Sequence, residues 1–329
     1  MAVPDWSQLG TLSYYFLLVF RQLAIFSVPA FFFITGYFIS YSALDKFHQT
    51  RWTFVWKRLK TLLIPYLIWS IILILGDILQ NNYSSVLEYL KLIVTTGIIG
   101  PYWFVPALCY CYILSPIIIL LVKRNWKLVL AAAGLIQLVP IIIGWLEYAR
   151  INIPLMDITT SFFHSWSPLQ WIFFFTFGIS SGFHIQKFTQ WVMKYRRVFF
   201  LLTVLSGILN IIESDFLYRS DLHIPSAING TITYTIYVTA FILWFLSLKD
   251  IPFSRSLSQL GVKSYGIYLL HYTIIEFVAR LIHKFLPQLL AYQVVFSPLL
   301  VIFGLGVPFL IMTTFLRTRF RQYYKYLFG

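Results

Sequence analysis

The chain contains few acidic residues and almost no cysteine. Asp and Glu together number 11 of its 329 residues, whereas Lys and Arg number 25, which gives a formal net charge of +14 at pH 7. The two cysteines, Cys109 and Cys111, stand two residues apart in an apolar stretch, and helical geometry would point them about 200° apart. One such pair without His or acidic neighbours falls short of a ligand set, so the sequence indicates neither a disulfide nor a metal site.

Several short catalytic motifs are also missing. The sequence has no Walker phosphate loop, no dinucleotide-binding glycine fingerprint and no Gly-x-Ser-x-Gly elbow. These absences argue against ATP-driven transport, nicotinamide chemistry and a soluble type of serine hydrolase. Four of the histidines fall in loops or at the edges of apolar runs and show no metal-ligand spacing. They are His164, His184, His223 and His283.

Long apolar runs make up most of the chain. Hydrophobic residues account for 59% and aromatic residues for 20% of the sequence, and the mean hydropathy of +0.78 is far above that of a soluble domain. We therefore predict an all-α fold, a polytopic integral membrane helix bundle with about nine transmembrane helices. The predicted helices are Leu23–Tyr41, Leu62–Leu79, Tyr102–Val122, Leu128–Trp145, Pro168–Phe183, Val198–Ile212, Ile228–Ser247, Ser264–Phe285 and Val294–Leu316.

Two of these helices are short for a membrane about 30 Å thick in its hydrocarbon core. The fifth and sixth, Pro168–Phe183 and Val198–Ile212, are expected either to extend beyond these limits or to border a polar cavity instead of lipid. A weaker amphipathic stretch, Val86–Ile99, is expected to lie on the membrane surface or to dip into it.

Lys and Arg collect in alternate loops. Most of them lie at residues 46–60, 123–127, 187–197, 249–263 and 317–325, whereas the loops between carry acidic residues. The positive-inside rule places the basic loops and the carboxyl end in the cytoplasm and the amino end outside. Because the basic residues flank apolar helices instead of forming one patch, we expect membrane lipid and not nucleic acid as their partner.

The densest cluster of cations comprises Lys57, Arg58 and Lys60, directly before the helix that contains Pro65 and Tyr66. Cations at the mouth of a membrane helix can hold phosphate groups. Alternatively, the cluster is a topogenic signal that contacts anionic lipid headgroups, worth about 1 kcal/mol per cation near the surface. Both interpretations place the three side chains at the cytoplasmic end of the helix.

Two further positions could carry chemistry inside the membrane. Arg21 would need a role or a partner at mid-membrane, where a charge costs about 2.5–3.5 kcal/mol, unless a helix that begins near Leu23 lets it reach the outer interface. His271 and Glu276 in the eighth helix suggest a cavity or a proton relay, although they stand about 140° apart around a helix. A lone His bonded to a neighbouring helix is the simpler interpretation of His271.

Four motifs follow one another along the chain. They are Arg21 with Val28–Gly36 (VPAFFFITG), Lys57-Arg58-x-Lys60 with Ile64-Pro65-Tyr66 and Trp69, Pro101–Leu108 (PYWFVPAL) with Pro116, and Gly261 with Ser264 and Tyr268–His271 (YLLH). In this order they resemble the membrane-bound acyltransferase family 3, most of all the branch that includes poly-N-acetylglucosamine O-acyltransferase and export-type proteins. The resemblance extends over about 250 residues.

The resemblance implies a single membrane acyltransferase domain over residues 1–329, located in the cell membrane. Such an enzyme moves an acyl group, usually acetyl from cytoplasmic acetyl-CoA, to a hydroxyl of a cell-surface glycan or lipid-linked sugar, without a metal. It also implies that Lys57, Arg58 and Lys60 hold the phosphates of CoA. Lys60 stands where the family commonly has Arg, and it keeps the charge but loses bidentate phosphate geometry.

The resemblance has a gap at its start. Family members usually have ten helices and begin with one that carries an Arg and a catalytic His, and no His precedes Arg21 in this sequence. We therefore expect the chain by itself to be weakly active or inactive, with His271 and Arg21 as the remaining candidates for the catalytic site. An alternative function is a polysaccharide or lipid-linked sugar exporter, whose basic loops would serve topology alone.

Overall fold

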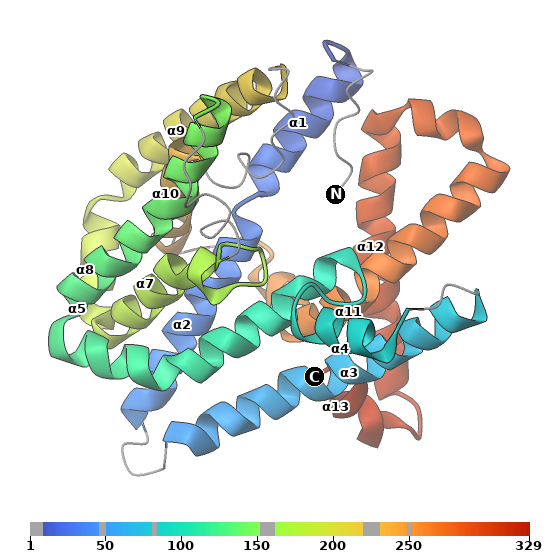
Figure 1. Cartoon of the computed structure of the whole chain (residues 1–329), viewed down its shortest axis with the longest axis horizontal. Coiled ribbons are helices and arrows are strands. Elements are labelled where there is room, and N and C mark those ends of the chain that lie inside the picture. The colour runs from blue at the N-terminus through green and yellow to red at the C-terminus, as the bar shows by residue number, and fades with distance from the viewer. Residues whose placement is uncertain are drawn as a thin grey trace.

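Every regular element in the described part of the chain is a helix, which confirms the predicted all-α class. The computed structural model describes residues 9–45, 51–80, 84–151, 162–219, 231–248, 250 and 252–329. From the amino end the elements are α1 Leu12–Ala24, α2 Ser27–Asp45, α3 Arg51–Leu79, α4 Val86–Val94, η2 Gly100–Trp103 and α5 Phe104–Tyr148. Then follow η3 Pro168–Trp171, α7 Ile172–Phe183, α8 Ile185–Lys194, α9 Arg196–Arg219, α10 Ile232–Leu246, α11 Ser254–Phe285, η5 Pro287–Ala291, α12 Gln293–Leu316, η6 Arg321–Tyr323 and α13 Tyr324–Leu327 (Figure 1).

Six helical stretches within the described residues are long and apolar enough to cross a membrane. They are Leu12–Tyr41, Trp52–Leu79, Gly100–Leu146, Arg196–Arg219, Ser254–Phe285 and Gln293–Leu316. α10 is equally apolar in character but shorter, at 15 residues. The chain is therefore a multi-pass membrane protein, as predicted, while the count of nine spans and their orientation stay predictions.

Two predicted helices, Tyr102–Val122 and Leu128–Trp145, are halves of one bent element. α5 has 45 residues, which at 1.5 Å per residue is about 68 Å, more than twice the hydrocarbon thickness. Asn125 interrupts it with φ −156° and ψ 86°, and its Oδ1 accepts a hydrogen bond from the Leu128 amide at 3.2 Å. Asn125 thus ends one helix and caps the next, and α5 turns back on itself (Figure 1).

The first predicted helix begins in the wrong place. A separate helix, α1, precedes α2 and already contains Arg21 in its last turn. Thr11 begins it, because its Oγ1 accepts a hydrogen bond from the Tyr14 amide at 3.3 Å. Hydropathy missed α1 because Arg21 and Gln22 interrupt its apolar run, whereas in the structure both side chains find partners on α9.

The two predicted helices that are short for a membrane, Val198–Ile212 and Pro168–Phe183, differ in outcome. α9 has 24 residues and extends the predicted Val198–Ile212 at both ends, which confirms the first of the two expectations. α7 stays short at 12 residues, and nine of them are buried. Its neighbours are α2 and α5, so protein and not lipid surrounds it (Figure 1).

Glycines allow α2 and α7 to touch backbone to backbone. Gly178 and Gly182 lie one turn apart on α7, and a Cβ at Gly178 would overlap the carbonyl oxygen of Phe33 on α2. A Cβ at Gly182 would overlap the hydroxyl of Ser40, and Gly36 of α2 faces α7 in the same way. This small-x-x-x-small spacing is the one that lets membrane helices approach most closely.

The predicted amphipathic stretch is helical over its first nine residues, as α4. Its apolar side chains are exposed, with Val86 and Leu87 each at 77%, as suits a helix on a membrane surface. Two tyrosine hydroxyls hold its carboxyl end: that of Tyr66 donates to the Ile93 carbonyl at 2.8 Å, and that of Tyr110 donates to the Val94 carbonyl at 2.7 Å.

The main core lies where α2, α5, α7 and α10 meet, and it is built from fully buried aromatic rings such as Phe32 and Phe174. Cys111 belongs to this core, whereas Cys109 packs in a second cluster with Tyr66 and Leu269. The two cysteines are both free. They therefore point to different sides of α5, as their spacing predicted.

Candidate active site

The predicted phosphate-binding residues lie together near the start of α3. The side chains of Lys57, Arg58 and Lys60 are all exposed. The guanidinium carbon of Arg58 lies 5.4 Å from the centre of the Phe54 ring, and Lys60 Nζ lies 5.6 Å from that of Trp56. Neither of the two ion pairs found within the described residues involves these cations, so their charge is available to an anionic ligand.

Arg58 continues a face of α3 that is covered further along the helix. Arg58, Leu62, Pro65 and Trp69 follow one another at spacings of four, three and four residues and so share one side of the helix. The Leu62 carbonyl accepts a hydrogen bond from the hydroxyl of Tyr265 on α11 at 2.5 Å. Trp69 Nε1 donates to the carbonyl of Leu327 in α13 at 2.8 Å. The cations therefore lie at the exposed end of the α3 face that contacts α11 and α13 through Leu62 and Trp69, here called the α3–α11 seam.

Helices α3 and α11 run in the same direction along this seam. Leu62 contacts Tyr265, and one turn further the Tyr66 ring lies 5.5 Å from that of Tyr102, whose hydroxyl donates to the Leu269 carbonyl at 2.9 Å. The same register puts Gly261 level with Arg58, where a Cβ would meet nothing within 4 Å. With a rise of 1.5 Å per residue, His271 lies about 15 Å further into the bundle than Arg58.

His271 carries a defined tautomer. Its Nδ1 lies 2.5 Å from the Tyr268 carbonyl oxygen, and because a carbonyl can only accept, Nδ1 must hold the hydrogen. The ring also has a hydrogen bond with the backbone of Ile267, on the same helix. Glu276 instead pairs with Arg280, one turn along α11, at 2.5 Å. The poor His271–Glu276 pairing expected from their angular separation is confirmed.

Three of the four sequence motifs meet in one aromatic cluster. The Phe32 ring of α2 lies 5.3 Å from that of Phe104, and Phe104 lies 5.4 Å from Tyr268 of α11. Phe32 also stacks on Trp171 at 5.2 Å, and Trp171 stacks on Trp103 at 5.5 Å. These contacts join α2, the start of α5, η3 before α7 and the middle of α11 next to His271. The fourth motif, with Arg58, reaches the cluster through the seam between α3 and α11.

Arg21 lies in a different seam, between α1 and α9. It donates a hydrogen bond to the Tyr218 hydroxyl, and next to it Asn210 Nδ2 donates to Gln22 Oε1 at 2.9 Å inside the protein. Tyr14 donates to Asp215 at 2.8 Å in the same seam. Arg21 thus has the partner that a membrane-embedded charge needs, and it is remote in the fold from the α3–α11 seam.

The polar residues on α9 were not predicted as part of any site. Asn210 and Asp215 stand in an apolar run, and an intramembrane polar residue is by itself a signal for a partner on another helix. The partners could not be named because α1 was not predicted. Within the described residues, no group of three or more His, Cys, Asp or Glu side chains could hold a metal ion.

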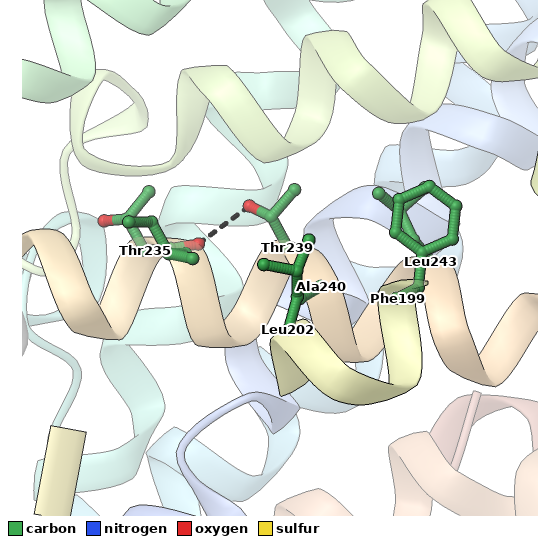
Figure 2. Close-up of a pocket in the computed structure, with 7 residues that line it drawn as sticks. Phe199, Leu202, Thr235, Thr239, Ala240 and Leu243 are labelled. Atoms are coloured by element: carbon green, nitrogen blue, oxygen red, sulfur yellow. Dashed lines mark hydrogen bonds between the residues drawn. The ribbon is translucent and has the colours of Figure 1, made fainter. Parts of the chain in front are cut away.

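A hollow of about 230 Å³ lies between α9 and α10. Phe199, Leu202 and Leu243 line it, together with the threonines Thr235 and Thr239 (Figure 2). The Thr239 hydroxyl donates back to the Thr235 carbonyl at 2.8 Å, so its one hydrogen is not free to donate to a ligand. The apolar hollow contains none of the predicted site residues and is not the candidate active site.

Comparison with known families agrees with the motifs. The family model described as an acyltransferase domain, acyltransferase family 3, matches residues 1–317. The chain belongs to acyltransferase family 3. No curated protein and no solved structure matched it. Membership, together with the apolar helices, makes the protein a multi-pass membrane acyltransferase.

Proposed function

We propose that the acyltransferase transfers an acyl group from cytoplasmic acyl-CoA to a hydroxyl of a cell-surface glycan or lipid-linked sugar. The proposed acyl group is acetyl. Family membership supports acyl transfer. The observation that carries the choice of donor is the group of unpaired cations, Lys57, Arg58 and Lys60, at the open end of the α3–α11 seam. The proposed location is the plasma or inner membrane, with the basic end in the cytoplasm.

The three cations suit the phosphate groups of CoA. Charge-assisted hydrogen bonds to phosphate are roughly twice as strong as neutral ones, and Arg58 can supply a bidentate fork. Lys57 and Lys60 act as point charges beside it. The pantetheine arm of the donor would then follow the seam inward, where the register of α3 and α11 leads to the aromatic cluster and His271.

The chemical step needs a proton acceptor. The acceptor hydroxyl attacks the thioester carbonyl and loses its proton, the carbon–sulfur bond breaks, and the CoA thiolate takes up a proton. A general base contributes typically about a hundred- to ten-thousand-fold to such a step. Of the two candidates, only His271 lies on the proposed donor route, next to Tyr268 of the aromatic cluster. Arg21 lies in the α1–α9 seam, where it binds Tyr218.

Donor binding separates this function from the rival one. We expect the purified chain in lipid nanodiscs to bind CoA saturably in a calorimetric titration, and Arg58→Ala to remove that binding. Arg280→Ala is the matched control, because Arg280 is an exposed arginine about 28 Å further along the register of α11. A wild-type chain that does not bind CoA would support the polysaccharide or lipid-linked sugar exporter instead.

A further inference from the structure

The chain continues past the residues matched by the family model and folds back on the bundle. The match ends at residue 317, and residues 318–329, here the C-terminal segment, include η6 and α13. α13 packs against α3 and also contacts α12, next to the carboxyl end of the chain (Figure 1). The segment is therefore a docked element that contacts the middle of α3, at Thr61 and Trp69.

A buried phenylalanine anchors the C-terminal segment. Phe328 is 4% exposed and packs with Ile267 and Leu270 of α11 and Met312 of α12. Gly266 makes room for it, because a Cβ at that position would lie 2.9 Å from the Cβ of Phe328. Fully burying a Phe side chain contributes about 1.5–3 kcal/mol, so the docked position is a specific one.

A second anchor places the segment on the face of α3 that carries Arg58. The Leu327 carbonyl accepts the hydrogen bond from Trp69 Nε1 at 2.8 Å. A Cβ at Gly329 would lie 3.7 Å from the Thr61 carbonyl oxygen, which is one turn of α3 from Arg58. The C-terminal segment therefore borders the open end of the α3–α11 seam.

The C-terminal segment carries positive charge of its own. Arg319, Arg321 and Lys325 are exposed, and neither of the ion pairs found in the described residues involves them. Lys325 Nζ lies 4.8 Å from the centre of the Tyr326 ring and the Arg319 guanidinium 5.4 Å from that of Phe320. Their positive charge is therefore open to solvent or to an anionic ligand.

We propose that the C-terminal segment is the second wall of the donor site and that Arg321 and Lys325 bind phosphate groups of CoA together with the cations of α3. The proposal rests on the proposed function, because it needs CoA to occupy the α3–α11 seam. A topogenic signal requires only charge in a loop, and it gives no reason for Phe328 and Trp69 to fix the segment against α11 and α3.

The test is CoA binding in nanodiscs of zwitterionic lipid, where the headgroup as a whole carries no net charge. We expect the double variant Arg321→Gln/Lys325→Gln to bind CoA roughly tenfold more weakly, as suits the loss of two partly solvated charge contacts. The matched control is Arg280→Gln/Lys284→Gln on the far end of α11, which should bind as the wild type does. Phe328→Asp should weaken binding to a similar extent, because it releases the segment with its cations intact.

The outcomes separate the two proposals. If the wild type binds CoA and Arg58→Ala does not, while Arg321→Gln/Lys325→Gln binds as tightly as the wild type, the C-terminal wall is wrong and the proposed function stands. The wall is equally wrong if the double variant differs from the wild type only in discs that contain anionic lipid, since the cations would then serve headgroups. If the wild type binds no CoA, both proposals fail. Unchanged melting temperature of the double variant in detergent excludes a folding defect.

Discussion

The hydroxyl of Tyr102 donates a hydrogen bond to the backbone carbonyl of Leu269 at 2.9 Å, and both residues are completely buried. The bond joins the start of α5 to the middle of α11. It fixes the register between the two halves of the bundle at the level where the α3–α11 seam reaches the aromatic cluster. The proposed donor route depends on this register.

Removing the Tyr102 hydroxyl should weaken that joint. Tyr102→Phe keeps the ring and loses one buried hydrogen bond, which should lower stability by about 1 kcal/mol. The measurement is thermal unfolding in detergent. Tyr110→Phe is the control, because its hydrogen bond to the Val94 carbonyl is exposed and water can replace the lost partner. Equal losses in both variants would contradict the role given to Tyr102.

A methyl group at Gly178 should force α2 and α7 apart. Gly178→Ala places a Cβ against the Phe33 carbonyl, and overpacking of this kind costs about 1–3 kcal/mol. Gly306→Ala on α12 meets nothing within 4 Å and should be neutral or stabilising by about 0.5–1 kcal/mol. Detergent unfolding curves of the two variants give the comparison, and a Gly178→Ala protein as stable as the wild type would rule out backbone contact between these helices.

The amide pair between α1 and α9 should behave as a coupled unit. Gln22 Nε2 and Asn210 Oδ1 are buried without a partner while the other two polar atoms bond each other. Asn210→Ala orphans Gln22 further and should cost about 1–3 kcal/mol. Gln22→Leu/Asn210→Leu removes all four polar atoms and should be close to neutral. Additive losses in the double variant, measured by unfolding, would show that the pair is not coupled.

Acyl transfer by the 329-residue chain should be weak. His271 is the candidate base on the proposed donor route, and Glu276, five residues along α11, pairs with Arg280 and so does not support it. We therefore expect little label to move from radiolabelled acetyl-CoA to a glycan acceptor. The measurement is product formation by the purified chain against a protein-free vesicle blank. Robust transfer that disappears in His271→Gln and persists in His283→Gln would refute the expectation and make Nε2 of His271 the proton acceptor.

Hydropathy located most helices because lipid contact leaves long apolar runs in the sequence. It failed at α1, where Arg21 and Gln22 interrupt the run, since one sequence cannot show that Tyr218 and Asn210 on α9 will satisfy them. The two halves of α5 were found, but the cap that Asn125 supplies was not. In that case a single Asn side chain decides the local geometry.

The cations of the candidate site could be predicted from the sequence, whereas the packing of the C-terminal segment beside them could not. Lys57, Arg58 and Lys60 stand out in any count of cations, and they lie exposed in the first turns of α3, before its apolar part. The cations of the C-terminal segment stand out in the same count, but its docking does not, because the docking depends on one ring, Phe328, that fits the space left by Gly266. Contacts of this kind, between residues 62 positions apart or more, are set by packing and not by local pattern.

Helices α2 and α7 pack as one rigid unit. With glycines at their crossing, no layer of side chains separates the two backbones, so the pair cannot absorb displacement through rotamer changes. The α11 side is joined to the rest by side chains, among them the hydroxyls of Tyr102, Tyr265 and Tyr268 and the ring of Phe104. Side-chain contacts can rearrange, whereas the backbone contact between α2 and α7 cannot. A bulky acceptor would therefore be admitted by movement of α11 and α12 relative to α2 and α7.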